Sequence, residues 1–172
     1  VWPAAGVGLA SLLLAPRRLW PAVALAIFAA GSAANVAVGV PLLAGLGYMT
    51  ANVAESVTCA WIITRVSDGH ARFARVREVL ALIACAMLVN AATACLGAAT
   101  GALTSETPFA AIWQTWFVAD ALGLLLVTPV LVTWAERPWI PAGVRWGRVA
   151  EAGAFAALWC ATAWLTMRTA DA

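Results

Sequence analysis

Long apolar runs alternate with short polar connections along this chain. A helix needs about 20 mostly apolar residues to cross the hydrocarbon core of a bilayer. Five runs reach that length, and a shorter apolar run at residues 3–15 precedes them. The five runs cover residues 19–38, 45–64, 78–100, 110–134 and 148–167. This pattern predicts an all-α, polytopic transmembrane helical bundle with about five full spans and one short N-terminal span.

The composition supports a membrane location. Hydrophobic residues make up 64% of the chain and charged residues only 10%, whereas soluble domains average about 45–50% and about 25%. A soluble core of this size could not hide so much apolar surface. We therefore expect the whole chain, residues 1–172, to be one integral membrane domain, cut from a longer protein because it begins at valine rather than methionine.

The arginines are distributed unevenly between the two ends of the predicted spans. Nine of the ten lie in or beside the connections 16–18, 65–77 and 135–147, while the connections 39–44 and 101–109 contain no Lys or Arg. Because basic connections stay on the cytoplasmic side, the Arg-rich connections are predicted to be cytoplasmic. Residue 172 is then outside, so a chain that feeds a cytoplasmic domain is expected to cross the membrane again after it.

Three polar side chains fall near the middle of three different spans. Glu55, Asn90 and Asp120 lie at similar depth, and Asn35 lies nearer the outer end of its span. A charged group at the bilayer centre costs at least about 2.5–3.5 kcal/mol on insertion scales. We therefore predict that these residues face the interior of the bundle, where they pair or line a cavity.

Helical spacing identifies the neighbours of these polar groups. Residues three or four positions apart share one helix face, which adds Asn52 to Glu55, and Trp113, Trp116 and Gly123 to Asp120. Pro129 is expected to kink its helix. Ligand- or signal-responsive candidates are Asp120, Glu55, Asn52, Asn90, Trp113, Trp116 and Asn35, with Gly123 and Pro129 as candidates for a kink or switch. A role as interhelical hydrogen-bond glue stays open for each polar residue, most strongly for Asn90 and Asn35.

The sequence contains no recognisable catalytic or metal-binding motif. The chain lacks HExxH, GxSxG and Walker motifs, and its single histidine, His70, excludes a site built on paired intramembrane histidines. The four cysteines lie within apolar runs and are interpreted as small buried hydrophobes. We therefore expect no catalytic residues, no metal and no cofactor in this region. The net charge of +2 gives no indication of a nucleic-acid partner.

Several segments are similar to one known family. WPAAGVGLA at residues 2–10, RLWP at 18–21, the pair Asn52 and Glu55, and WQTWFVADALGLLLVTPVL at 113–131 resemble motifs of MASE1, a bacterial membrane-associated sensor domain. The resemblance implies a multi-span input domain of about eight helices in the cell (inner) membrane. It also implies a cytoplasmic output domain in the same chain, such as a histidine kinase of a two-component system or a diguanylate cyclase that makes cyclic di-GMP.

Two functions remain open from the sequence. In the first, the chain is a sensory input domain that relays a stimulus by helix repacking. Its partners are then the lipid bilayer, the output domain and either a second copy or a membrane partner protein. In the second, the polar residues at the midplane form the substrate site of a small-solute transporter or of a substrate-binding membrane subunit.

Overall fold

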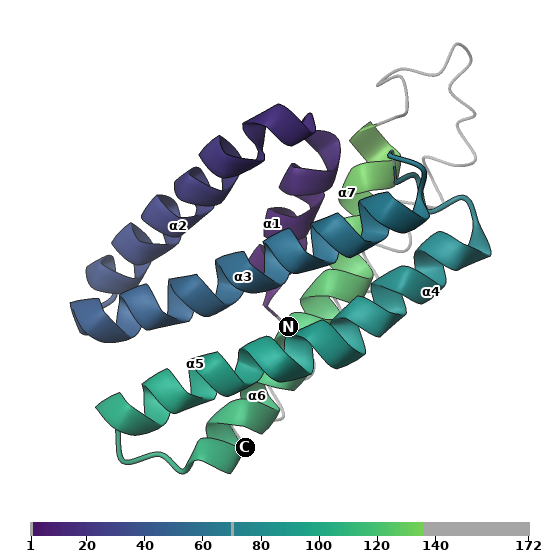
Figure 1. The fold of residues 1–172 in the computed structure, drawn as a ribbon. Helices are drawn as coiled ribbons and strands as arrows, with labels where there is room; N and C mark the ends of the chain where they lie inside the picture. Colours follow the sequence, from purple (N-terminus) through teal and green to yellow (C-terminus); the bar gives the residue numbers. More distant parts are fainter. Residues whose placement is uncertain (1, 70, 136–172) are drawn as a thin grey trace, which may run out of the picture. The chain divides into compact units, whose positions relative to one another are not determined.

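The structure, a computed structural model, describes residues 2–69 and 71–135, and these residues form helices joined by short connections (Figure 1). No strand occurs in these two ranges, so the prediction of an all-α fold is confirmed for them. The predicted span 148–167, the connection before it, His70 and Cys160 lie outside the described residues.

The helices follow the predicted apolar runs closely. In chain order they are α1 (Pro3–Leu14), the 3-10 turn η1 (Arg17–Leu19), α2 (Trp20–Ala37), α3 (Leu42–Val66), α4 (Val76–Ala84), the π-helical segment η2 (Cys85–Val89), α5 (Asn90–Thr104), α6 (Phe109–Leu122), the π-helical segment η3 (Gly123–Val127) and α7 (Thr128–Ala135). Four helices, α1, α2, α3 and α6, begin at or beside a proline. Proline suits a helix start because the first N–H groups have no partner within the helix.

Among the described residues, three helical stretches are long and apolar enough to cross a membrane. They are Arg17–Ala37, Val76–Thr104 and Phe109–Ala135, and they correspond to three of the predicted spans. The helix α3 has 25 residues, but polar residues such as Asn52 and Glu55 lower its hydropathy. The short α1, with 12 residues, agrees with the predicted short N-terminal span. The predicted number of five full spans is not confirmed.

The helix α3 contacts more of the bundle than any other described helix. It packs against α1, α2, α4 and α5, and Figure 1 shows it running beside the continuous helix α4–α5. The helix α1 packs against α3 and also against η3 and α7. By contrast, α2 contacts mainly α3 and α1 and contains no buried residue. The enclosed core therefore lies around α1, α3 and the two helices that contain π-helical segments, with α2 at its margin.

Two of the Arg-rich connections lie at the same end of the bundle. The Arg17 guanidinium donates a hydrogen bond of 3.0 Å to the Thr64 hydroxyl near the end of α3. In the connection after α3, Asp68 is paired with Arg75 and Arg77. The hydrogen bond from Arg77 is the main reason that the pKa of the exposed Asp68 carboxyl lies below its ordinary value. This arrangement is compatible with one basic, solvated end.

The sidedness of the chain can be tested with single cysteines. After replacement of the four native cysteines, we expect Ser105→Cys, in the connection before α6, to react with an impermeant thiol reagent added outside intact cells. Ala74→Cys, in the connection before α4, is expected to react only after the membrane is opened, because its connection is rich in arginine. Labelling of position 105 only from the cytoplasmic side would contradict the assignment.

Candidate functional site

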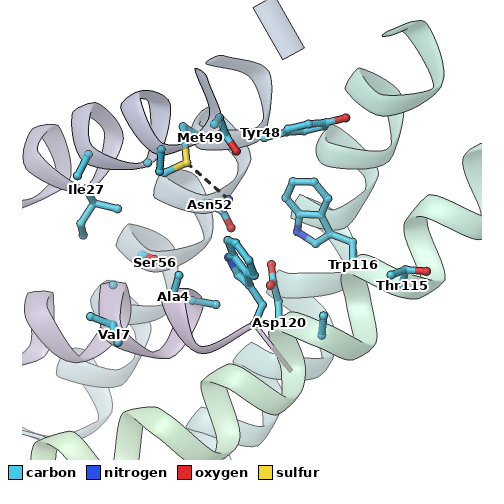
Figure 2. Close-up of a pocket in the computed structure, with 18 of the residues that line it drawn as sticks. Ala4, Val7, Ile27, Tyr48, Met49, Asn52, Ser56, Thr115, Trp116 and Asp120 are labelled. Atoms are coloured by element: carbon cyan, nitrogen blue, oxygen red, sulfur yellow. Dashed lines mark hydrogen bonds between the residues drawn. The ribbon is translucent and has the colours of Figure 1, made fainter. Parts of the chain in front are cut away.

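A cavity of about 960 Å³ lies between α1, α2, α3 and α6. Its walls are mostly apolar, and Figure 2 shows side chains from several helices extending into it. Its polar and aromatic lining includes Asn35, Tyr48, Asn52, Ser56, Trp116 and Asp120. A largely apolar pocket with a few convergent polar groups, in the size range of about 300–1,000 Å³, is typical of small-molecule sites.

The side chain of Asp120 extends from α6 into this cavity (Figure 2). Asp120 is only 3% exposed, and its Oδ2 atom has no hydrogen-bond partner among the described residues. Trp116 lines the cavity one helical turn earlier, and its ring lies 5.3 Å from the ring of Tyr48, measured between centroids. A buried carboxyl oxygen without a donor is costly, so the Oδ2 atom of Asp120 is one of the unsatisfied atoms of the cavity wall, although the Trp116 side chain interacts with the same carboxyl group.

The helix α3 supplies the second polar group of the cavity. The Nδ2 atom of Asn52 has only the Met49 sulfur as a partner, at 4.0 Å, and its buried Oδ1 atom has none among the described residues. Figure 2 shows Asn52 and Asp120 extending toward the same space from α3 and α6. Asn35 also lines the cavity, from α2, and packs against Gly45. Two unsatisfied acceptors therefore belong to residues that line the same mostly apolar space.

Glu55 is buried beside the cavity but does not line it. It is fully buried on α3, and its Oε1 atom accepts a hydrogen bond of 3.4 Å from Thr93 on α5. The Oε2 atom has no partner among the described residues. Its carboxyl group is close enough to Asp120 for the two groups to interact electrostatically. The interior of the bundle thus holds two neighbouring carboxyl groups, one in the cavity and one behind it.

Asn90 joins two helices rather than lining the cavity. It follows η2, where its own backbone N–H bonds to the Cys85 carbonyl five residues earlier. The side-chain Nδ2 atom donates to the Ala86 carbonyl at 3.3 Å and to the Phe117 carbonyl of α6 at 2.8 Å. The side chain therefore serves the Ala86 carbonyl that the π turn leaves without its usual donor. These contacts are those of interhelical hydrogen-bond glue.

Trp113 also contributes to the contact between α5 and α6. Its indole N–H donates to the Ala91 carbonyl at 3.0 Å, and its ring stacks on Phe117 with 5.1 Å between centroids. Of the seven candidate responsive residues, the structure brings four together in the cavity: Asn35, Asn52, Trp116 and Asp120. Of the other three, Glu55 contacts α5, and Asn90 and Trp113 each join α5 to α6.

A π-helical segment, η3, follows Asp120 after two residues and precedes Thr128 and Pro129. Pro129 has no N–H to offer the Leu125 carbonyl, and a wider turn accommodates this loss. The role of Gly123 is close approach, because a Cβ at this position would meet the Trp2 backbone oxygen. The Thr128 hydroxyl donates to the Gly6 carbonyl of α1 at 3.2 Å. The segment η3 is therefore the place where α1 crosses closely.

Some cavity residues are not among the candidates from the sequence. Ser56 and Met49 could have been found, since they stand four residues after and three residues before Asn52 on the same helix face. Trp2 and Ile27 carry no such signal, because they reach the cavity only through the packing of α1 and α2. Within the described residues, no group of three or more His, Cys, Asp or Glu side chains could hold a metal ion.

Comparison with known proteins assigns the chain to a family. Neither the curated proteins nor the solved structures yield a match to the chain. The family model of MASE1 matches residues 1–172, which is the whole chain. The motifs quoted from the sequence place Asn52, Trp116 and Asp120 of the cavity inside the segments that carry the resemblance. This chain therefore belongs to the MASE1 family of membrane-associated sensory domains.

Proposed function

We propose that this chain is the sensory input domain of a bacterial signal-transduction protein of the histidine kinase or diguanylate cyclase type. The observation that carries the proposal is Asp120, a buried carboxyl group that lines a cavity and nearly adjoins a π-helical segment, with one oxygen that has no hydrogen-bond partner among the described residues. The domain is taken to span residues 1–172 and to lie in the inner membrane with its Arg-rich connections in the cytoplasm. In this arrangement α3 crosses the bilayer beside the three more apolar helices.

The proposed relay combines a group that changes partners with a helix that has two packings, as molecular switches require. Asp120 is the group, and η3 with Pro129 is the element that can repack. An α-helix turns by about 100° per residue, so closing the extra residue of a π turn would rotate the following segment by about that angle. That segment is α7, which packs on α1 and leads toward the predicted third Arg-rich connection.

The partners of this domain are the surrounding lipid bilayer and an output domain of the same chain. A further partner is either a second copy of the chain or a membrane partner protein. A small-solute transporter is the alternative function, because the cavity could equally hold a transported molecule. Membership of a family of sensory domains favours the input domain. The two functions can be distinguished by measurement. A transporter moves solute across the membrane even when no output domain responds, whereas a sensory input domain moves none.

Replacement of Asp120 by asparagine in the full-length protein tests the proposal. The amide keeps the size of the side chain but cannot carry a charge, so we expect normal abundance in the membrane and an output that no longer responds. The basal output should change by about tenfold, the factor that corresponds to about 1.4 kcal/mol. Kinase or cyclase activity in isolated membranes is the measurement.

The matched control is Glu106→Gln, the same chemical change at an exposed position before α6, which should leave output unchanged. An Asp120→Asn protein with unaltered abundance and unaltered response would show that the proposal is wrong. Loss of the protein from the membrane, with full response restored by a suppressor substitution elsewhere, would assign Asp120 to structural glue.

A further inference from the structure

Two hydrogen-bond acceptors in the cavity have no donor among the described residues. They are Oδ2 of Asp120 and Oδ1 of Asn52, and both atoms are buried. A ligand that satisfies them must bring donors rather than acceptors. We propose that the cavity binds a hydrophobic molecule carrying a protonated amine, whose N–H groups bond to Asp120 and Asn52.

The apolar walls determine the rest of the ligand. Ile27 and Met49 line the cavity from α2 and α3, and Val7 lines it from α1. Filling such a space with hydrocarbon is favourable by about 25 cal/mol per Å² of apolar surface removed from water. The volume of about 960 Å³ leaves room for a body of drug-like size. The ligand is therefore amphiphilic, with one cationic end and an apolar remainder.

Charge distinguishes an amine from other donors. A protonated amine and a carboxylate form a charge-assisted hydrogen bond, which is about twice as strong as a neutral one. The aromatic rings of Trp116 and Tyr48 lie in the same wall, and rings attract cations through their π faces. Glu55, close behind the cavity, adds a second acidic group. These features favour a cation, admit a neutral alcohol poorly and oppose an anion.

Two other occupants would fill the space without satisfying its polar atoms. A lipid acyl chain would cover the apolar walls and leave both acceptors unpaired, which is costly once the chain excludes water from them. A hydrophobic segment of this chain from beyond residue 135 would have the same shortcoming unless it carried a donor at the matching depth. A binding experiment with soluble probes distinguishes a soluble amine from both of these occupants.

This inference rests on the proposed function, because occupancy of the cavity by the amine is taken to be the stimulus. Binding and output are therefore measured separately. The full-length protein is placed in lipid nanodiscs and titrated calorimetrically with 4-phenylbutylamine, 4-phenylbutanol and 5-phenylpentanoate, with empty nanodiscs as the blank. The three probes share one apolar body and differ only in the terminal group.

We expect saturable binding of the amine above the blank, with affinity at least about tenfold higher than for the alcohol and no saturable binding of the carboxylate. Asp120→Asn should weaken amine binding by about tenfold or more, the loss expected for one charge-assisted hydrogen bond. Thr50→Val, at an exposed position of α3 outside the cavity lining, should leave the affinity within about twofold.

Several results would overturn the inference. No saturable amine binding would mean that lipid or another segment of the chain occupies the cavity. Equal affinities for the amine and the alcohol would show that the amine forms no ion pair with Asp120. The comparison of the three probes on the unaltered protein keeps the test decisive even if Asp120→Asn fails to fold. Binding of the amine without any change in output would instead contradict the proposed input role and leave the site intact.

Discussion

Replacing Gly6 by leucine is expected to remove most of the correctly folded protein from the membrane. A Cβ atom at Gly6 would meet the Gly123 backbone oxygen and would lie 2.6 Å from the Cβ of Val127. A backbone oxygen cannot move aside as a flexible side chain can, so α1 would have to separate from η3. Overpacking of a close contact typically costs about 1–3 kcal/mol, and here the displaced helix also loses the hydrogen bond from Thr128 to Gly6.

The measurement is the abundance of the protein in the membrane together with its unfolding temperature in detergent. Ala33→Leu is the matched control, because it adds bulk at an exposed position of α2 and should change neither quantity appreciably. Equal behaviour of Gly6→Leu and Ala33→Leu would show that α1 does not pack closely on η3 and that Gly123 has no role in close approach.

Replacing Asn90 by leucine is the second change with a large expected effect. Leucine is similar in size but leaves the Ala86 and Phe117 carbonyls without the donor they have in the structure. The Ala86 carbonyl suffers most, since the backbone N–H of Asn90 is already bonded to Cys85. Interhelical hydrogen bonds in membranes are worth about 0.6–2 kcal/mol, and an unsatisfied buried carbonyl adds about 1–3 kcal/mol.

We therefore expect a clear fall in the unfolding temperature for Asn90→Leu, measured in detergent on the purified protein. Thr115→Val serves as the control, because the Thr115 hydroxyl is exposed and only duplicates a helical contact with the Ala111 carbonyl. If the two variants unfold at the same temperature, Asn90 is not interhelical glue. A normal unfolding temperature with altered output would instead return Asn90 to the signal-responsive residues.

The helices themselves could be predicted because their signals are local. Apolar runs of sufficient length, separated by prolines and polar connections, anticipated the helices from α2 to α7 within a few residues. The number of spans was harder to predict, since α3 carries the polar residues of the site and is less apolar than its neighbours. The same hydrophobicity that marks a lipid-facing helix is weakened in a helix that lines a functional interior.

The π-helical segments were only partly accessible from the sequence. Pro129 gave reason to expect a distortion near residue 129, and η3 ends two residues before it. No proline lies in or beside η2, and no other local sequence signal predicts the wider turn there. It becomes understandable only from Asn90, whose side chain supplies a donor to Ala86 and also reaches Phe117 on another helix.

The sequence by itself determined that the chain is helical and membrane-embedded, and that Glu55, Asn90 and Asp120 avoid lipid, because the hydration of a polar group is lost wherever it enters the bilayer. The three are indeed buried. Only the tertiary structure decided their partners: Asp120 faces the cavity, Glu55 meets Thr93, and Asn90 joins α5 to α6. Helical periodicity defines a face of one helix, but the neighbour of that face depends on how helices distant in the chain cross.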